Sequence, residues 1–451
     1  MKKFLLTTTC LSVLAGCSLA PDYQRPDVTT PAKWSQSQEA AAVKVAQDWW
    51  TNFNSPELNA LMTEALNDNL DLKASVQRIE QSRAALKGSR ASLFPSVNAS
   101  VGANQSFAEG GDTDNSWNGG VNLSYEADLF GAVRSAVSAG EARLEGTIYT
   151  HEALRLVVMS DVAQTYFNLL AARSRLATAD QNLKNAEELL RVVQARFDAG
   201  ADSALEVAQQ KSTLESTRAS RASLQSTVST TENALNLLLG KPPLTVTVAT
   251  TTLDQIVVPA IDAGVPSDLL RNRPDIRAAE TTLVEANANI GAARAALYPS
   301  VTLGSTWSVA ASSFGDPATS ALALAASLAA PIFQGGRLEA GVEQATARQL
   351  ELMESYRQTV LTSFREVEDA LVVIRAAQTR EIALGSALTE AQKAYDLSEQ
   401  RYKAGAIDFQ ALLDAQRTLF SARDTYLQVK NERLAAAVTL FKAVGGGWTQ
   451  N

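Results

Sequence analysis

The sequence predicts an α+β membrane protein whose chain consists of two similar halves. Three observations lead to this fold class. Blocks of sequence recur at one spacing, each half contains uncommonly long helical patterns, and each half contains two short segments that alternate between polar and apolar residues. The spacing of about 204 residues is far longer than that of a solenoid repeat, so each half must combine several elements.

The recurring blocks keep the same order in both halves and lie between 203 and 205 positions apart. The four pairs are NLDLKAS from Asn69 with RPDIRAA from Arg273, RASLFPSV from Arg90 with RAALYPSV from Arg294, DLFGAVR ending at Arg134 with PIFQGGR ending at Arg337, and RFDAGADSALEV from Arg196 with RYKAGAIDFQAL from Arg401. Four matches in one order indicate an internal duplication.

The N-terminus has the pattern of a secretory signal peptide over residues 1–16. Two lysines precede an apolar stretch that is too short to cross a bilayer. The LAGC box that follows predicts cleavage before Cys17 and lipidation of that cysteine. Ser18, in place of an aspartate, favours sorting to the outer membrane. An ordinary signal peptide with a chance cysteine is the alternative.

Composition argues against an enzyme and against a nucleic-acid partner. Removal of the leader takes the formal net charge from −8 to −10, so a polybasic surface is not supported. Cys10 leaves with the leader, and a lipidated Cys17 provides no disulfide, thiol nucleophile or metal ligand. The one histidine, His151, falls inside a helical pattern, and no phosphate loop or Ser-His-Asp set is present. We therefore expect no enzyme activity, no cofactor and no metal site.

Two regions, 131–240 and 334–444, predict long helices of coiled-coil type with turns near residues 200 and 405. A helix from near Arg143 to Ala199 would be roughly 85 Å long. The apolar seams are Leu169, Leu176, Leu183, Leu190 and Phe197 in the first half, and Met353, Tyr356, Val360, Phe364, Val367, Leu371 and Ile374 in the second.

Both turns carry helix-end signals. Gly200 occupies the place of a left-handed residue after a helix, and Ser203 with Glu206 forms a capping box for the next helix. Gly405 repeats the design, with Asp408 as the expected N-cap. Each half is therefore predicted to contain a helical hairpin.

The segments 95–130 and 299–333 each predict two strands of about ten residues around a polar turn. Strands of this length cross a bilayer when tilted, and their alternation suits a barrel wall with lipid outside and water inside. Four strands cannot close a barrel, and open edges are not tolerated in hydrocarbon. The pattern therefore predicts several protomers around one barrel, most simply three for twelve strands. An edge sheet outside a membrane is the alternative.

The chain resembles the TolC-like outer membrane efflux proteins (outer membrane factors), in the lipoprotein branch associated with multidrug efflux pumps. The resemblance runs end to end and rests on long motifs. These are CSLAPDYQRP from Cys17, DWWTNFNSPEL from Asp48, VPSDLLRNRPDIRAAE from Val265, ANANIGAARAALYPS from Ala286, LLDAQRTLFSAR from Leu412 and AVGGGW from Ala443.

The resemblance implies a homotrimer in which a twelve-stranded outer membrane barrel continues into a long periplasmic α-helical tunnel with a mixed equatorial band. Pro95 and Pro299 would mark the switches from helix to strand, because proline disfavours a helical conformation before it. The expected parts are the lipidated N-terminal segment and band residues 17–60, tunnel helices 61–94 and 269–298, the equatorial linker 241–268 and the C-terminal tail 445–451.

The resemblance also implies a periplasmic gate beyond the second turn. Asp414, Arg417 and Tyr402 would form it, with Glu206 as a first-half carboxylate able to face an arginine. Gln410 departs from the family, because close relatives can carry an apolar constriction there. The turns at Gly200 and Gly405 resemble the family's docking sites for the periplasmic adaptor.

The implied function is a passive duct for drugs or other small toxic compounds, fed by an inner membrane pump of the resistance-nodulation-division type through a periplasmic adaptor (membrane fusion protein). The duct would be lipid-anchored in the outer membrane. Metal ions or type I secreted polypeptides are alternative cargoes, and a periplasmic adaptor lipoprotein is the alternative from another class. The sequence leaves the substrate range, the cognate pump and the resting state of the gate open.

Overall fold

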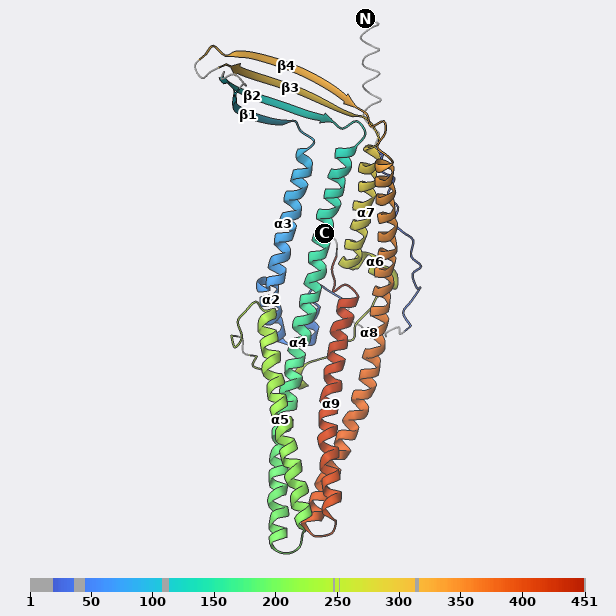
Figure 1. Cartoon of the computed structure of the whole chain (residues 1–451). Coiled ribbons are helices and arrows are strands. Elements are labelled where there is room, and N and C mark those ends of the chain that lie inside the picture. The colour runs from blue at the N-terminus through green and yellow to red at the C-terminus, as the bar shows by residue number, and fades with distance from the viewer. Residues whose placement is uncertain are drawn as a thin grey trace. The chain divides into compact units, whose positions relative to one another are not determined.

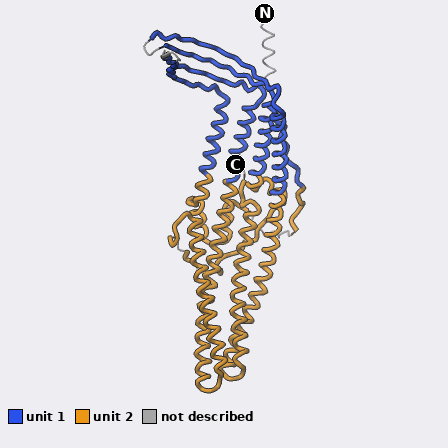
Figure 2. The backbone as a smooth tube through the Cα atoms, viewed as in Figure 1, with its two compact units in different colours: residues 1–28, 76–150, 277–359 blue, residues 29–75, 151–276, 360–451 orange. Residues whose placement is uncertain are grey.

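The computed structural model describes residues 19–35, 45–107, 113–245, 248–250, 252–312 and 316–449 (Figure 1). The predicted signal peptide and Cys17 lie outside these residues. The chain divides into two compact units, coloured separately in Figure 2. Unit 1 comprises residues 1–28, 76–150 and 277–359, and unit 2 comprises residues 29–75, 151–276 and 360–451.

Unit 1 contains one antiparallel sheet of four strands, in the order β1-β2-β3-β4. The strands are β1 (Ser96–Phe107), β2 (Thr113–Ala127), β3 (Ser300–Ala311) and β4 (Thr319–Ala329). β2 pairs with β3, with Val121 opposite Trp307, so one sheet joins strands from both halves of the chain. Within the described residues neither β1 nor β4 has a second neighbour, and every residue of β4 is exposed.

Four helices run through or into unit 1. These are α3 (Leu70–Ala91), α4 (Ala132–Asp198), α7 (Pro274–Ala295) and α8 (Arg337–Lys403), and α4 and α8 have 67 residues each. No helix in the described ranges has an apolar stretch long enough for a membrane span.

The helix α4 begins at Ala132, inside the range 131–240 given to the first pair of long helices and eleven residues before Arg143, from which the helix length was estimated. Asp128 accounts for this start. Its carboxylate accepts hydrogen bonds from Val133 N at 3.1 Å and Arg134 N at 2.9 Å, two donors that the first helical turn leaves free.

Unit 2 contains α2 (Pro56–Asp68), α5 (Ala204–Leu238), α6 (Leu269–Asn272), α9 (Phe409–Ala443) and the 3₁₀ segments η1 (Trp49–Phe53), η2 (Leu253–Gln255) and η3 (Pro266–Asp268). Its aromatic core anchors η1 to the long helices. The Trp49 ring stacks on Phe441 at 4.9 Å between centroids, Phe53 lies 5.0 Å from Phe167, and all four side chains are fully buried.

Two predicted tunnel helices are interrupted. The range 61–94 contains the end of α2 and all of α3, and the range 269–298 contains α6 and α7. Asn69 ends the first helix and caps the second, since its Oδ1 accepts from Asp71 N and Leu72 N at 3.0 Å. Arg273 is extended (φ −100°, ψ 117°) because it precedes Pro274.

The two predicted apolar seams differ in burial. Val360, Phe364, Val367 and Leu371 of the second seam are all buried. In the first half Leu169 of the predicted seam is fully buried, its next three leucines are half-buried and Phe197 is 39% exposed, whereas a second stripe with a spacing of seven, made of small side chains, is buried throughout. The buried stripe consists of Ala172, Ala179, Ala186 and Val193. Leucine spacing therefore identified the helix, but the predicted seam follows its fully buried face only at Leu169.

Candidate functional site

Both turns between the paired long helices of unit 2 have the same backbone design. Gly200 and Gly405 have φ values of +76° and +71°. After them, Ala201 N donates to Arg196 O and Ala406 N donates to Arg401 O, both at 2.8 Å, which is the pattern of a Schellman C-cap. A Cβ added at either glycine would meet nothing within 4 Å, so the backbone conformation and not crowding requires glycine.

The helices that follow the turns begin with side-chain caps. Asp408 Oδ1 accepts from Ala411 N at 2.9 Å, and Glu206 Oε2 accepts from Ser203 N at 2.6 Å. Glu206, expected to face an arginine, forms no ion pair within the described residues of this chain. The structure assigns its carboxylate to the start of α5.

A different carboxylate connects the two turns. The Tyr402 hydroxyl, at the end of α8, donates to Asp202 Oδ2 in the first turn. Arg196 Nε, at the end of α4, lies 3.0 Å from Asp202 Oδ1, and the Arg196 guanidinium lies 4.7 Å from the centroid of the Tyr402 ring. We call these three residues the Tyr402 cluster. Sequence reasoning included Tyr402 but missed Asp202 and Arg196.

Burial and charge stabilise the Tyr402 cluster. The Tyr402 side chain is 1% exposed and the Asp202 side chain 3% exposed. Burial, followed by the hydrogen bond to Asp202, raises the pKa of Tyr402 well above its ordinary value. The hydrogen bond to Asp202 raises the pKa of Arg196. Tyr402 is therefore a neutral donor and Arg196 a cation at any physiological pH, and both stabilise the Asp202 carboxylate.

The surroundings of the Tyr402 cluster are apolar and come from both hairpins. Separation of the two hairpins at this point would therefore expose apolar surface on both of them, which is unfavourable. The buried core here consists of Leu189, Val193, Val207, Ala391, Tyr395, Tyr402, Phe409, Leu412, Leu413 and Leu419.

The other predicted gate residues lie on an exposed face of α9. Gln410 Nε2 donates to Asp414 Oδ1 at 3.0 Å, one helical turn away. Arg417 has no ion pair within the described residues and lines a cavity of about 500 Å³. The same cavity is bordered by an ion pair between Arg175 Nε and Asp424 Oδ1 at 2.6 Å. The structure thus brings Gln410 and Asp414 together, and places Tyr402 in a separate buried contact.

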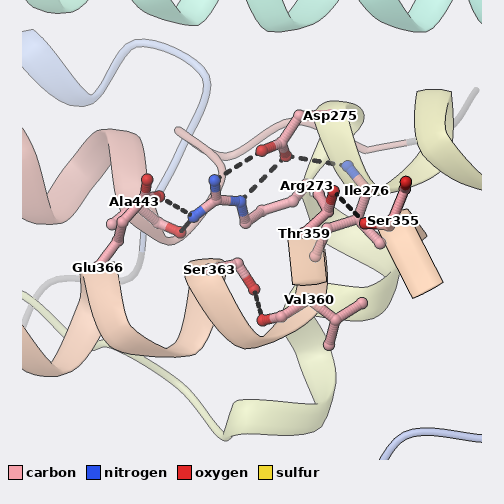
Figure 3. Close-up of polar contacts among 9 residues, drawn as sticks. All are labelled: Arg273, Asp275, Ile276, Ser355, Thr359, Val360, Ser363, Glu366 and Ala443. Carbon is pink, nitrogen blue, oxygen red and sulfur yellow. Dashed lines mark hydrogen bonds and ion pairs between the residues drawn. The ribbon is translucent and has the colours of Figure 1, made fainter. Parts of the chain in front are cut away.

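A second charged junction in unit 2 centres on Arg273, which is 8% exposed (Figure 3). Its guanidinium donates to both carboxylate oxygens of Asp275, to Glu366 Oε2 at 2.7 Å and to Ala443 O at 3.0 Å. Burial by itself lowers the pKa of Arg273, but the two carboxylates raise it above its ordinary value. Arg273 therefore ties the start of α7 to α8 and to the last residue of α9.

The remaining predicted positions are accounted for by local structure. Pro95 and Pro299 stand directly before β1 and β3, and each lies four residues after the last residue of the preceding helix, α3 or α7. His151 Nδ1 lies 2.7 Å from Ser75 Oγ, a contact between two helices of unit 2. In the described part of the chain no group of three or more His, Cys, Asp or Glu side chains is placed to hold a metal ion.

Comparison with known proteins relates this architecture to a family. The sequence model described as outer membrane efflux protein matches residues 61–241 and 265–446. The chain is 37% identical to the pyoverdine export outer membrane protein OpmQ of Pseudomonas aeruginosa, over 99% of this chain and 97% of that protein. It is 34% identical to the cation efflux system protein CusC of Escherichia coli, over 97% of each. Among solved structures, the outer-membrane channel OprN superposes with a TM-score of 0.87 at 30% identity, over 96% of this chain and all of that one.

Proposed function

Since the chain belongs to the outer membrane efflux protein family, and is an outer membrane channel and not an enzyme, we propose that it is the exit duct of a tripartite efflux system. The observation that carries this proposal is the match to export proteins over nearly the whole chain. An isolated helical hairpin protein, such as a periplasmic adaptor, would not match along the strands, the linker and both hairpins.

The duct is a homotrimer with a twelve-stranded barrel. The support is the pair of free sheet edges on β1 and β4, whose backbone groups need partners inside hydrocarbon. A barrel of about twelve strands leaves a lumen, whereas about eight strands fill their own interior. Exposed apolar side chains on α8 offer a surface to a neighbouring copy, and they are Leu350, Leu361 and Val372.

The halves of the chain arose by internal duplication. Equivalent glycines with positive φ close both hairpins, and the sheet order places one strand pair from each half side by side. The trimer thus has six similar modules around one axis.

The gate is closed by two layers. The Tyr402 cluster holds the two hairpins of one protomer together at their turns. On the exposed face of α9, Asp414 forms a ring of three carboxylates in the trimer, and Arg417 relieves their repulsion. Gln410 makes the constriction polar at a position where relatives can carry an apolar side chain. Its amide donates a hydrogen bond to Asp414 and so joins the ring.

The cargo is a small toxic compound, such as a drug, delivered by a resistance-nodulation-division pump through a periplasmic adaptor that docks at the turns of Gly200 and Gly405. The relatives named above export pyoverdine and cations, so metal ions are the second candidate and secreted polypeptides the third. The methionines do not favour a methionine-lined cation path, since Met62 and Met159 are buried in the protomer and only Met353 is partly exposed among the described residues. The duct is anchored in the outer membrane by lipid on Cys17.

Single-channel recordings in planar bilayers test the duct and its gate together. We expect the wild-type protein to open rarely, and Asp414→Ala and Arg417→Ala to open more often. Thr379→Ala, on an exposed face of α8, is the matched control and should behave as the wild type. Unchanged currents in both variants would mean that Asp414 and Arg417 do not form the gate and that it lies elsewhere in the chain. The absence of any channel from folded protein would contradict the duct and favour an adaptor.

A further inference from the structure

A cavity of about 500 Å³ in unit 2 is lined by residues of α4, α5 and α9. Its volume is in the range of roughly 300–1,000 Å³ that small-molecule sites occupy. Ion pairs join α4 to both other helices, namely Asp180 with Arg221 of α5 and Arg175 with Asp424 of α9. The three helices that border the cavity are therefore held together by charged contacts on both sides of α4.

The α5 side of the cavity is rich in hydroxyl groups. They belong to Ser212, Thr213, Ser216, Thr217, Ser220 and Ser223. The hydroxyls of Thr213, Ser216 and Thr217 donate to carbonyls of the preceding helical turn, at distances between 2.8 and 3.1 Å. Because their hydrogens are occupied in this way, these three oxygens can only accept a further hydrogen bond. This wall therefore suits a ligand that carries O–H or N–H donors.

The α9 side of the cavity carries a positive charge without a partner. Three charged side chains line the cavity, and they are Arg175, Arg417 and Asp424. Asp424 accepts from Arg175 through both carboxylate oxygens, at 2.6 and 3.1 Å, and also from Gln428. Arg417 has no ion pair within the part of the chain that the structure describes. Its planar guanidinium is therefore available to a carboxylate, which it can bind through two parallel N–H groups.

Asn182 of α4 adds a buried neutral donor, since it lines the cavity and is 8% exposed. Its Oδ1 accepts from Arg423 Nη1 at 3.0 Å, and among the described residues its Nδ2 has no partner. Arg423 also donates to Gln392, which is neutral, so its charge adds to the positive potential behind the cavity wall. A buried amide group is stabilised when it has an acceptor. Asn182 and Arg423 therefore favour an anion as well.

Phe420 of α9 and Leu224 of α5 supply an apolar surface to the same cavity. Arg417 and Phe420 are three residues apart on α9, so they occupy neighbouring positions on one helix face. A ligand whose anionic group binds Arg417 therefore places the adjoining part of its skeleton next to the Phe420 ring. A flat apolar group packs favourably there.

We propose that this cavity is a binding site for a small organic anion, namely an aromatic carboxylate that also carries a hydroxyl or amide donor. The carboxylate binds Arg417, the ring packs on Phe420, and the donor bonds the hydroxyl oxygens of α5. A cationic ligand is disfavoured, because the one charge in the cavity without a partner is positive. The binding site stands on the cavity alone. Its role in the duct, where a passing anion would compete with the Asp414 ring for Arg417, rests on the proposed function.

Equilibrium dialysis of the full-length protein in detergent micelles tests the site. The probes are 4-hydroxybenzoate and the neutral 4-hydroxybenzamide, which have the same shape and differ in charge. We expect the wild type to bind the acid about tenfold more tightly than the amide, because hydrogen bonds between ionised groups are the stronger ones. Arg417→Gln should bind the acid only as weakly as the amide. Arg191→Gln, which changes an exposed arginine of α4 outside the cavity, is the matched control and should bind as the wild type.

A second pair of variants tests the cavity itself. Ser220→Phe fills the cavity and should weaken the binding of 4-hydroxybenzoate severalfold, whereas Ser229→Phe, at an exposed position of α5 outside the cavity, should not. Benzoate, which lacks the donor, should bind severalfold more weakly than 4-hydroxybenzoate.

The proposal is overturned if the wild type does not bind 4-hydroxybenzoate, or if Arg417→Gln or Ser220→Phe binds it as tightly as the wild type does. Dialysis needs no open channel. A failure of the channel recordings with binding intact would therefore contradict the duct and not the site.

Discussion

Asn69 in the first half of the chain and Arg273 in the second each donate a side-chain hydrogen bond to the last carbonyl of a long helix. Asn69 Nδ2 donates to Leu238 O at the end of α5 at 2.8 Å, and Arg273 Nη1 donates to Ala443 O at the end of α9 at 3.0 Å. Both residues stand at a break between two helices. Each break therefore holds the end of the hairpin of its own half, although one side chain is neutral and the other charged.

Substitution of these two residues should have unequal effects. Arg273→Met removes a buried guanidinium and its hydrogen bonds, but the carboxylates of Asp275 and Glu366 are 40% and 42% exposed and can be solvated, so we expect a loss of about 2–3 kcal/mol in the free energy of unfolding. Asn69→Ala removes hydrogen bonds only and should cost about 1–2 kcal/mol. Thermal unfolding followed by helical circular dichroism checks both values. Arg271→Met is the control, because the exposed ion pair of Arg271 with Asp268 should contribute little.

Asp202 rather than Glu206 should control the gate. Asp202→Asn and Tyr402→Phe each weaken the contact between the turns, and we expect the open probability to rise roughly tenfold, as a loss of about 1.4 kcal/mol implies. Glu206→Gln keeps a side-chain acceptor for Ser203 N and should change the open probability little. Single-channel recordings decide between the carboxylates. A larger effect of Glu206→Gln than of Asp202→Asn would support Glu206, the carboxylate predicted from sequence, as the gate residue.

The two turn glycines should be sensitive to backbone strain and not to size. Gly200→Ala and Gly405→Ala force an alanine into the left-handed region, which costs about 1–2 kcal/mol per turn. Hydrogen exchange at the ends of α4 and α8 should accelerate accordingly. Gly341→Ala is the matched control, because that glycine is helical with open space around it, and the exchange of α8 should slow slightly or stay unchanged.

Tyr395 should give the hairpins a measurable sensitivity to alkali. Burial, followed by the charges of Glu399 and Asp396, raises the pKa of Tyr395 from 10.0 to about 12. The folded protein holds this proton more tightly than the unfolded chain, so the associated stability is complete below pH 10 and is lost as the pH rises to about 12. The loss is at most about 3 kcal/mol.

Absorbance of the tyrosinate at alkaline pH, as the difference between wild type and Tyr395→Phe, should titrate near 12 in folded protein and near 10 in denaturant. The stability of Tyr395→Phe should depend less on pH over the same interval. Equal midpoints in the folded and unfolded proteins would contradict the shift.

Features that depend on a few neighbouring residues could be predicted from sequence. Gly405 and Asp408 identified a turn and a cap, because a left-handed residue and an N-cap each follow from local chemistry. Pro95 and Pro299 lie where helix gives way to strand for the same reason. The outer membrane channel family also followed from motifs that run along the whole chain.

Features that depend on contacts between distant segments could not be predicted. The sequence indicated Glu206 as a carboxylate able to face an arginine, but it did not indicate Asp202, because the pairing of Asp202 with Tyr402 depends on which side chain of the first turn reaches across to α8. The predicted seam places Leu183 on the inward face of α4. In the structure Ala179 and Ala186 are the buried residues there, because close packing of helices favours small side chains. In the sequence, only the proline that follows Arg273 indicates that the helix is broken there.

Residues 19–25 bond along α7 through Arg25, Pro21 and Leu19, and this contact has a consequence for the order in which the protein assembles. Arg25 and Glu280 are 255 residues apart in sequence, so residues 19–25, which the ribosome makes early, have no place to dock until α7 has been made and exported. Contacts over such separations form late, since closing the intervening loop costs entropy before the contact stabilises anything. Residues 19–25 are therefore among the last of the described residues to reach their final position, and until then the face of α7 that they cover stays open.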